Sequence, residues 1–235
     1  MKWRSLQEST PEPGSRRLYE IYAERRELIA RYVPVEIQAI HARVVEELKT
    51  SAVDQQALRA GDSAPPFELR DQGGALVRST DLLSRRLLVL CFIRGRWCPF
   101  CVGQMEAMNT MVPELERLGA SLVAISPQTM HQSFLMADQH KLGFPLLSDS
   151  GNQISRQFGL VYRVPEYQQE VYRRALVNLP FVNGDATWEL PFPATFIIGR
   201  TAGDPARILY ASSNPDYSER PEPTEILSKI ELLLS

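Results

Sequence analysis

The sequence predicts an α/β fold with a central sheet covered by helices on both faces. Apolar segments of strand length alternate along the chain with segments of helical periodicity. One apolar segment, 87–93, is continuous, as in a central strand that is buried on both faces. With 235 residues, 44% of them hydrophobic, the chain can form a domain with a packed core, and a fully disordered protein is excluded.

A helical arm is expected before the sheet. Residues 1–16 hold prolines, a glycine and polar residues, and we interpret them as a flexible lead-in. From 17 to 58, apolar residues recur at three- and four-residue spacing on both sides of Pro34, which predicts two amphipathic helices. A Gly-Asp-Ser-Ala-Pro-Pro segment then ends the helical pattern. We therefore predict a lead-in and helical arm over 1–60 and an α/β domain over 61–235.

The two predicted helices need a surface to pack on. An isolated helical pair of this size is marginally stable, because its apolar faces remain in water. The faces can pack on the domain itself or on a second subunit. Of the two, we slightly favour a homodimer formed through the N-terminal helices.

The domain is expected to alternate strands and helices before it ends in a hairpin and a helix. The expected elements are a hairpin of 67–70 and 75–78, the central strand 87–93, a helix from about 98 to 118, a strand at 122–125, a helix at 132–141, a short strand at 145–147, antiparallel strands at 194–198 and 207–211, and a closing helix at 222–234. This order is typical of a sheet with helices on both faces.

Neither the charge nor the apolar pattern of the sequence predicts binding to nucleic acids or membranes. The formal net charge is −2 and the pI is about 6.0, so there is no basic footprint for a nucleic acid. The first residues lack the apolar stretch of a signal peptide, and no apolar run is long enough to span a bilayer. We expect a cytoplasmic protein with neither kind of partner.

The three cysteines are too few for a disulfide scaffold. Cys98 and Cys101 form a C-x-x-C pair, which is either a redox motif or half of a zinc site. Zinc would need two more ligands, but Cys91 lies apart and the three histidines show no ligand spacing. We therefore expect a redox pair and no metal or cofactor. Cys91, inside the apolar strand, is expected to be a buried core residue.

The cysteine pair lies where a buried strand passes into a helix. A helix is expected to begin at about Cys98, with Pro99 at an early helical position. Thiols in the first helical turn are close to unpaired N–H groups and to the positive end of the helix dipole, which favour the thiolate. Arg94 and Arg96 add positive charge nearby. Because the thiolate is the nucleophile, the pattern predicts an activated sulfur, at Cys98 or at Cys101.

The spacing also indicates the fate of an oxidised sulfur. Side chains at positions i and i+3 face each other, so a sulfenic acid on one cysteine can be resolved by the other to a disulfide. Trp97 precedes the pair and is expected to cover it and exclude water. Two cysteines that are close only by chance are the less favoured interpretation, because Trp97 and Pro99 form a specific context.

Four segments carry a family resemblance. They are 92–101 (Phe-Ile-Arg-Gly-Arg-Trp-Cys-Pro-Phe-Cys), 124–128 (Ala-Ile-Ser-Pro-Gln), 144–149 (Phe-Pro-Leu-Leu-Ser-Asp) and 188–197 (Trp-Glu-Leu-Pro-Phe-Pro-Ala-Thr-Phe-Ile). Together they resemble the peroxiredoxin-like branch of the alkyl hydroperoxide reductase and thiol-specific antioxidant family, in order, over about residues 60–233. The resemblance implies a thioredoxin-like fold, reduction of hydroperoxides by a cysteine, and regeneration by thioredoxin or a similar dithiol donor.

The resemblance assigns the two cysteines in two ways. In typical peroxiredoxins a threonine stands three residues before the peroxidatic cysteine, so Cys98 takes the threonine place and Cys101 the peroxidatic place. In thioredoxins the first cysteine of the pair attacks, which would make Cys98 the nucleophile. Both assignments stay open.

The resemblance also marks supporting residues. Typical peroxiredoxins carry an arginine just before the strand that here begins Ala-Thr-Phe; this chain has Pro193 there, as thioredoxins do, where a cis-proline faces the cysteines. Thr195 follows in the same strand. Arg94 or Arg96 is the candidate to replace the missing guanidinium, stabilising the thiolate and polarising the O–O bond.

The remaining histidines, Glu106 and three tyrosines are expected to have structural or surface positions and no part in the chemistry. We expect surface positions for His41, His131 and His140, and a solvated helix face for Glu106. The tyrosines 162, 167 and 172 are expected in the core or at an interface.

Three functions follow from these observations. The first is a thiol peroxidase that uses the Cys98/Cys101 pair. The second is a thioredoxin-like protein-disulfide reductase in which Cys98 attacks. The third is a non-catalytic redox sensor or binding module, in which the arm meets a partner and the cysteines only report oxidation.

Overall fold

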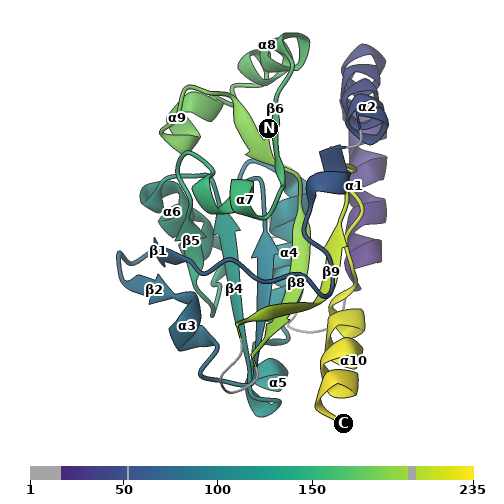
Figure 1. Ribbon diagram of the computed structural model, residues 1–235. Helices are drawn as coiled ribbons and strands as arrows, with labels where there is room; N and C mark the ends of the chain where they lie inside the picture. Colours follow the sequence, from purple (N-terminus) through teal and green to yellow (C-terminus); the bar gives the residue numbers. More distant parts are fainter. Residues whose placement is uncertain (1–16, 52, 201–204) are drawn as a thin grey trace.

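The sheet at the centre of the molecule has seven strands in the order β2-β1-β5-β4-β3-β8-β9 (Figure 1). It belongs to a computed structural model that describes residues 17–51, 53–200 and 205–235, so the predicted lead-in and the turn at 201–204 lie outside the described residues. The strands of this sheet are β1 (Glu68–Arg70), β2 (Leu76–Arg78), β3 (Leu87–Phe92), β4 (Ala120–Ser126), β5 (Leu146–Ser148), β8 (Ala194–Gly199) and β9 (Arg207–Ser213).

The sheet is mixed, because β3 pairs in parallel with β4 and antiparallel with β8. The helices along the chain are α1 (Leu18–Tyr32), α2 (Val35–Thr50), α3 (Ser79–Leu82), α4 (Pro99–Asn109), α5 (Val112–Arg117), α6 (Met130–His140), α7 (Gln153–Gln157), α8 (Glu166–Arg174), α9 (Leu179–Asn183) and α10 (Pro223–Leu234), with a 3₁₀ turn, η1 (Val53–Gln56). The predicted central strand, the hairpins on either side of it and the closing helix are all present.

Alternate side chains of β3 enter two different hydrophobic clusters. Val89 and Cys91 pack in the cluster that contains residues of α1, α4 and α10. Leu90 and Phe92 pack in the cluster that contains residues of α2, α7 and α8. A strand that is buried throughout and contributes to two cores must have helices on both faces, which confirms the predicted fold class.

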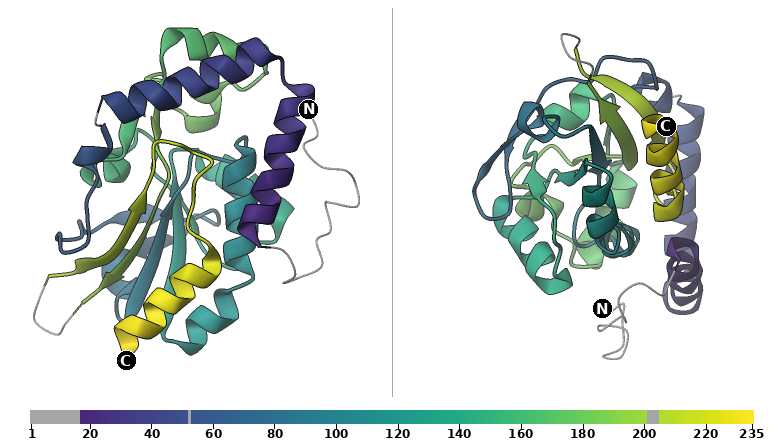
Figure 2. Two further views of the ribbon diagram at one scale, coloured as in Figure 1. Left: turned by 90° about the vertical axis from the view of Figure 1, so that its right-hand side faces the viewer. Right: turned by 90° about the horizontal axis from the view of Figure 1, so that it is seen from below.

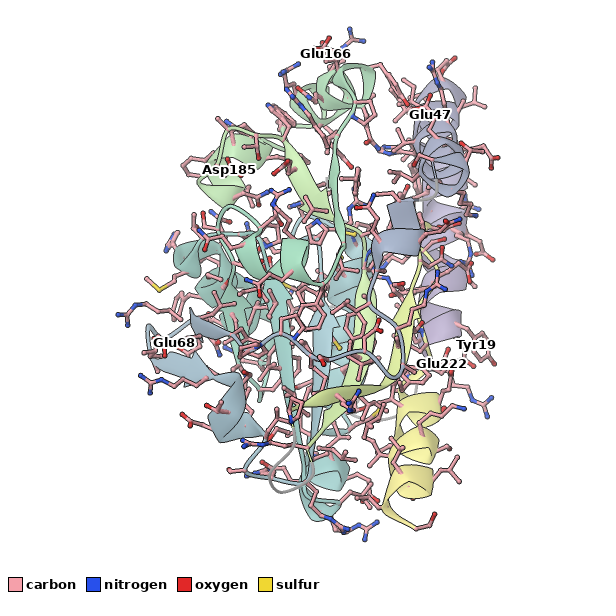
Figure 3. The ribbon with its side chains drawn as sticks, in the orientation of Figure 1. Tyr19, Glu47, Glu68, Glu166, Asp185 and Glu222 are labelled. Carbon is pink, nitrogen blue, oxygen red and sulfur yellow. The ribbon has the colours of Figure 1, made fainter. Side chains whose placement is uncertain are left out.

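The N-terminal arm, α1 and α2, is docked on the domain of its own chain. Helix α1 runs beside α4, and α2 lies against α8 (Figure 2). The backbone N–H groups of Leu18 and Tyr19, in the first turn of α1, donate to the carboxylate of Glu222 at distances of 3.0 and 2.6 Å (Figure 3). Such a carboxylate satisfies N–H groups that have no partner within the helix.

This docking covers part of the apolar surface that suggested a second subunit. Ile21, Tyr22 and Val44 are all buried within the chain. The homodimer stays a prediction, but a second subunit is no longer needed to bury these apolar side chains.

One predicted helix is divided in the structure. The sequence pattern suggested a helix from about 98 to 118, whereas α4 ends at Asn109 and α5 starts at Val112. Pro113 explains the break, because it has no N–H to donate and its ring would clash with the carbonyl group four residues earlier. It lies at the start of α5, where a proline is tolerated.

A segment between β5 and β8 forms structure that the sequence patterns did not resolve. It contains α8, α9 and a small antiparallel sheet of β6 (Val161–Arg163) and β7 (Glu189–Pro191). In Figure 1 this segment rises above one end of the large sheet, beside α2. It brings aromatic side chains over the end of β3, where the cysteine pair lies.

Candidate active site

The site starts where β3 passes into α4. Gly95 lies in this connection at φ = +137°, and a Cβ atom on it would come within 3.0 Å of Trp97 and 3.1 Å of Gln128. Cys98 is the N-cap of α4, and its amide donates to the Gly95 carbonyl at 3.1 Å. Pro99 follows at the first helical position. The sequence-predicted helix start is therefore present, with Cys101 in the first turn.

Both sulfur atoms of the pair are buried. Cys98 is 1% exposed and Cys101 is 0% exposed. The Cys101 sulfur accepts hydrogen bonds from the backbone N–H of Arg94 at 3.4 Å and from Nη2 of Arg220 at 3.5 Å, and it is hydrogen bonded to Cys98. Three donors therefore surround one sulfur, which suits an anion.

The two thiols differ in acidity. Burial opposes ionisation of Cys101, but the hydrogen bond from Cys98 and the charges of Arg220 and Arg94 outweigh it and hold the pKa of Cys101 well below its ordinary value. Burial, followed by the hydrogen bond to Cys101 and the charge of that sulfur, raises the pKa of Cys98 well above its ordinary value. The arrangement therefore favours a thiolate at Cys101 and a protonated Cys98 that donates to it.

Arg220 is a site residue that sequence reasoning missed. It lies between β9 and α10, 119 residues from Cys101 in the chain. Its guanidinium donates to the side-chain carbonyl of Gln104 and, at 3.1 Å, to the backbone carbonyl of Tyr217. These contacts fix the guanidinium beside the sulfur. No local pattern around Arg220 indicates this role.

Gln104 links Arg220 to the strand that holds Thr195. Its side-chain amide donates to the Thr195 hydroxyl at 3.2 Å, and that hydroxyl lies 3.8 Å from the sulfur of Cys91. Thr195 is therefore connected to the site only indirectly, because Gln104 bonds both the Thr195 hydroxyl and Arg220. Cys91 is fully buried, and burial raises its pKa to about 11, in keeping with the core role expected for it.

Arg94 occupies an aromatic cage. Its guanidinium carbon lies 4.7 Å from the ring centre of Trp97 and 4.4 Å from that of Tyr217, and Nη2 donates to the hydroxyl of Tyr172. Tyr162 is hydrogen bonded to the same guanidinium. Arg94 is 2% exposed, and its Nε has no hydrogen-bond partner among the described residues. Two of the three tyrosines expected only in the core or at an interface therefore surround a site residue.

Two sequence-predicted residues are placed differently from the expectation. Arg96 is exposed, and its side chain donates to Gln132 at 3.3 Å, away from the sulfurs. Pro193 is buried beside β8, but the described chain contains no cis peptide bond, so the expected cis-proline is wrong. Only Phe192 and Pro193 connect β7 to β8, and the peptide bonds of this connection are trans.

The expected surface positions are wrong for two histidines and for Glu106. His41 on α2 is partly buried, and its Nδ1 lies 3.0 Å from the side-chain amide of Gln168, because the arm docks over the site. Burial and the charge of Arg94 lower the pKa of His41 to about 4. His140 on α6 is 2.8 Å from the carboxylate of Glu106 on α4, and both are largely buried where the helices meet. His131 is exposed, as expected.

The described residues offer neither a metal site nor a membrane-spanning helix. Within 17–51, 53–200 and 205–235, no group of three or more His, Cys, Asp or Glu side chains is arranged to hold a metal ion. Across the same part of the chain, no helix has the length and apolar character to cross a membrane.

Comparison with known proteins connects this geometry to a family. The model of the AhpC/TSA family matches residues 60–202. Peroxiredoxin Bcp of Escherichia coli (strain K12) is 35% identical over 103 residues, which are 44% of this chain and 65% of that protein. The chloroplastic peroxiredoxin Q of Sedum lineare is 32% identical over 100 residues, or 43% of this chain and 53% of the relative. The matched region is therefore less than two thirds of either relative.

A solved structure shares the fold. The crystal structure of peroxidoxin BcpB from Mycobacterium tuberculosis superposes with a TM-score of 0.58 at 23% sequence identity, covering 76% of this chain and 99% of that one. The central sheet and its helices are therefore those of a thioredoxin-like fold.

Proposed function

Because the chain belongs to the AhpC/TSA family, we propose that it is a thiol peroxidase that reduces hydroperoxides with Cys101 as nucleophile and Cys98 as resolving thiol. One observation carries the assignment. Cys101, not Cys98, accepts hydrogen bonds from the backbone of Arg94 and from the guanidinium of Arg220. The two relatives named peroxiredoxin support the choice of substrate class.

The chemistry follows from this charge distribution. The Cys101 thiolate attacks the terminal peroxide oxygen, the O–O bond breaks, and the leaving alkoxide takes up a proton to form an alcohol, or water from hydrogen peroxide. Cys101 becomes a sulfenic acid. The guanidinium groups of Arg94 and Arg220 stabilise the negative charge that moves onto the peroxide oxygens.

Cys98 completes the first half of the cycle. Its sulfur attacks the sulfenic sulfur of Cys101, water is released, and the Cys98–Cys101 disulfide forms. A dithiol donor, thioredoxin or a similar protein, then supplies two electrons and regenerates both thiols. We place this cycle in the cytoplasm, and we keep a homodimer as a proposal that light scattering of the purified protein tests.

The alternative of a disulfide reductase is less well supported. It requires Cys98 to attack, but the pKa of Cys98 is raised by burial and by its hydrogen bond to Cys101. The reductase hypothesis was also favoured by an expected cis-proline at position 193, but the peptide bond before Pro193 is trans. A non-catalytic redox sensor would use the same activated sulfur, because sensor cysteines also react as thiolates, so catalytic turnover of peroxide is the property that distinguishes it from the peroxidase.

Stopped-flow oxidation by hydrogen peroxide tests the proposal. The reduced protein is mixed with peroxide and followed by tryptophan emission, since Trp97 adjoins the pair, in wild type, Cys98→Ser and Cys101→Ser. We expect oxidation much faster than that of free cysteine in wild type and in Cys98→Ser, and none in Cys101→Ser. Rates equal to that of free cysteine in all three proteins would reject the peroxidase. Reduction of a model protein disulfide that depends on Cys98 alone would then favour the reductase.

A further inference from the structure

We propose that the Cys98–Cys101 disulfide is a strong oxidant, which transfers readily to dithiol partners and is difficult to keep formed in a reducing thiol pool. The inference rests on the proposed function as the source of the disulfide, and it adds how strongly that disulfide oxidises a dithiol and which residue determines this strength. It concerns the equilibrium between the dithiol and disulfide forms of Cys98 and Cys101. Arg94 and Arg220 shift this equilibrium through their positive charges.

Among the described residues, the site holds two guanidinium groups and no carboxylate. Arg94 is 2% exposed inside its aromatic cage, and Arg220 is held against Gln104 and the Tyr217 carbonyl. Within the described part of the chain, neither guanidinium forms an ion pair with Asp or Glu. The Cys101 sulfur lies 3.5 Å from Nη2 of Arg220, and the charges of Arg220 and Arg94 both favour its thiolate.

Oxidation removes that negative charge. In the reduced protein the buried thiolate contacts the Arg220 guanidinium and is further stabilised by the charge of Arg94, whereas in the disulfide both cations remain and this negative charge is lost. Leaving a buried charge without its partner is strongly unfavourable. The reduced state is therefore stabilised relative to the disulfide, and a dithiol pair whose reduced form is stabilised has an oxidising disulfide.

The same charges define the path of exchange. A thiolate of the partner attacks the sulfur of Cys98 and forms a mixed disulfide, and Cys101 leaves as the stabilised thiolate. The partner's second thiol, as thiolate, then attacks its own sulfur in the mixed disulfide and releases Cys98, which takes up the proton. The partner loses two electrons and becomes a disulfide, while Cys98 and Cys101 are reduced. Cys101 is the better leaving group because Arg220 donates to it.

Redox equilibration with glutathione, without any peroxide, tests the proposal. Full-length protein is equilibrated over a series of reduced-to-oxidised glutathione ratios, quenched by alkylation and quantified by mass, with a thioredoxin in parallel. We expect an equilibrium constant for disulfide formation at least about tenfold smaller than that of the thioredoxin, equivalent to one pKa unit of thiolate stabilisation or more. A constant within about threefold of the thioredoxin value would overturn the proposal.

Variants separate the charge from the fold. Arg220→Gln should increase the constant about tenfold or more towards the disulfide, and Arg220→Lys should restore part of the wild-type value because it keeps the positive charge. Arg174→Gln is the matched control, since it removes an arginine whose side chain is 74% exposed and ion-paired to Glu170. Its constant should equal that of wild type. An Arg220→Gln protein with native circular dichroism and an unchanged constant would reject the role of the guanidinium.

A transfer assay completes the test. Protein oxidised with diamide is mixed with a synthetic peptide that contains two cysteines, and the peptide should be converted to its disulfide with one equivalent of protein reduced. No transfer within hours would contradict the proposal. Because diamide supplies the disulfide, a failure of the peroxidase assay leaves this result interpretable, and the two hypotheses fail independently.

Discussion

Tyr22 on α1 donates a hydrogen bond of 2.7 Å to the backbone carbonyl of Phe100, which lies between the two cysteines of the site. The two rings also meet edge to face, with centres 5.1 Å apart. The arm is therefore fastened directly to the turn that carries the reactive sulfurs. Since both sulfurs are buried, reagents reach them only when this region opens.

Removal of this hydrogen bond should expose the thiols. In Tyr22→Phe the ring contact is kept and the carbonyl of Phe100 loses the hydrogen bond from the tyrosine hydroxyl, a cost of about 1 kcal/mol. We expect alkylation of Cys98 and Cys101 by iodoacetamide to accelerate about fivefold, measured by mass spectrometry at neutral pH. Tyr19→Phe is the control, because Tyr19 is 52% exposed on the same helix. Equal alkylation rates in wild type and Tyr22→Phe would show that opening of the site does not involve α1.

A second prediction concerns the junction between the arm and the domain. Gly159 has φ = +71°, and a Cβ atom there would lie 1.9 Å from the backbone carbonyl oxygen of Gln56. Gly159→Ala should therefore lower the free energy of unfolding by about 3 kcal/mol or more, measured by urea denaturation. Gly151→Ala separates clash from backbone strain, since Gly151 has φ = +82° and no atom within 4 Å of the added Cβ. Its cost should be about 1 kcal/mol. Equal losses in both variants would remove the clash from the explanation.

A third prediction concerns acid stability. The pKa of His41 is lowered to about 4, whereas in the unfolded chain it is expected near 6.5. Between these values the unfolded chain binds more protons, so the contribution of neutral His41 is complete above about pH 6.5 and is lost as the pH falls towards 4. As the pH falls over this range, the free energy of unfolding of wild type should decrease by about 2 to 3 kcal/mol more than that of His41→Gln, measured by urea denaturation. His131→Gln, at an exposed position of α6, should behave as wild type. A wild-type protein whose stability has the same pH dependence as His41→Gln would contradict the assignment.

A fourth prediction uses the acidity of Cys101. Its pKa lies below the ordinary thiol value because the hydrogen bond from Cys98 and the charges of Arg220 and Arg94 outweigh burial. The rate of reaction with hydrogen peroxide should therefore be constant from pH 7 to higher pH and fall only in acid, as the thiolate is protonated. In Arg220→Gln this fall should move to higher pH by about one unit or more. The absorbance of the thiolate at 240 nm in Cys98→Ser provides an independent titration. Unchanged profiles in Arg220→Gln would exclude Arg220 from thiolate stabilisation.

The parts of this structure that were predictable depend on short stretches of chain. The strand before the pair, the helix that begins at Pro99 and the closing hairpin were correct because apolar periodicity and proline position determine them locally. The break before α5 also has a local cause, Pro113, which the apolar periodicity concealed.

Other features are determined by contacts between distant segments. Arg220 reaches Cys101 across 119 residues, and nothing in its own neighbourhood distinguishes it from a surface arginine. His41 is buried only because α2 docks against α8, and Tyr172 meets Arg94 only because the segment between β5 and β8 folds over the end of β3. Periodicity places residues on a face of a helix, but it does not give the partner of that face.

The last prediction distinguishes the roles of Arg94 and Arg96 in the reaction with peroxide. Arg94 and Arg96 were both candidates to support the thiolate, but only Arg94 points into the site, where its backbone N–H contacts Cys101 and its guanidinium fills the aromatic cage. Arg94→Gln should lower the second-order rate constant with hydrogen peroxide about tenfold or more, because one of two buried cations is lost. Arg96→Gln should change it less than about twofold, because that side chain is exposed and bonded to Gln132.

Arg94→Lys gives a further distinction between charge and cage. It keeps a cation but cannot fill the planar space between Trp97 and Tyr217, so its rate constant should lie between those of wild type and Arg94→Gln. Near-ultraviolet circular dichroism shows whether the aromatic cage persists in each variant. If Arg96→Gln loses as much activity as Arg94→Gln while both keep the native spectrum, the peroxide contacts the exposed arginine, and the buried cage has a structural function instead.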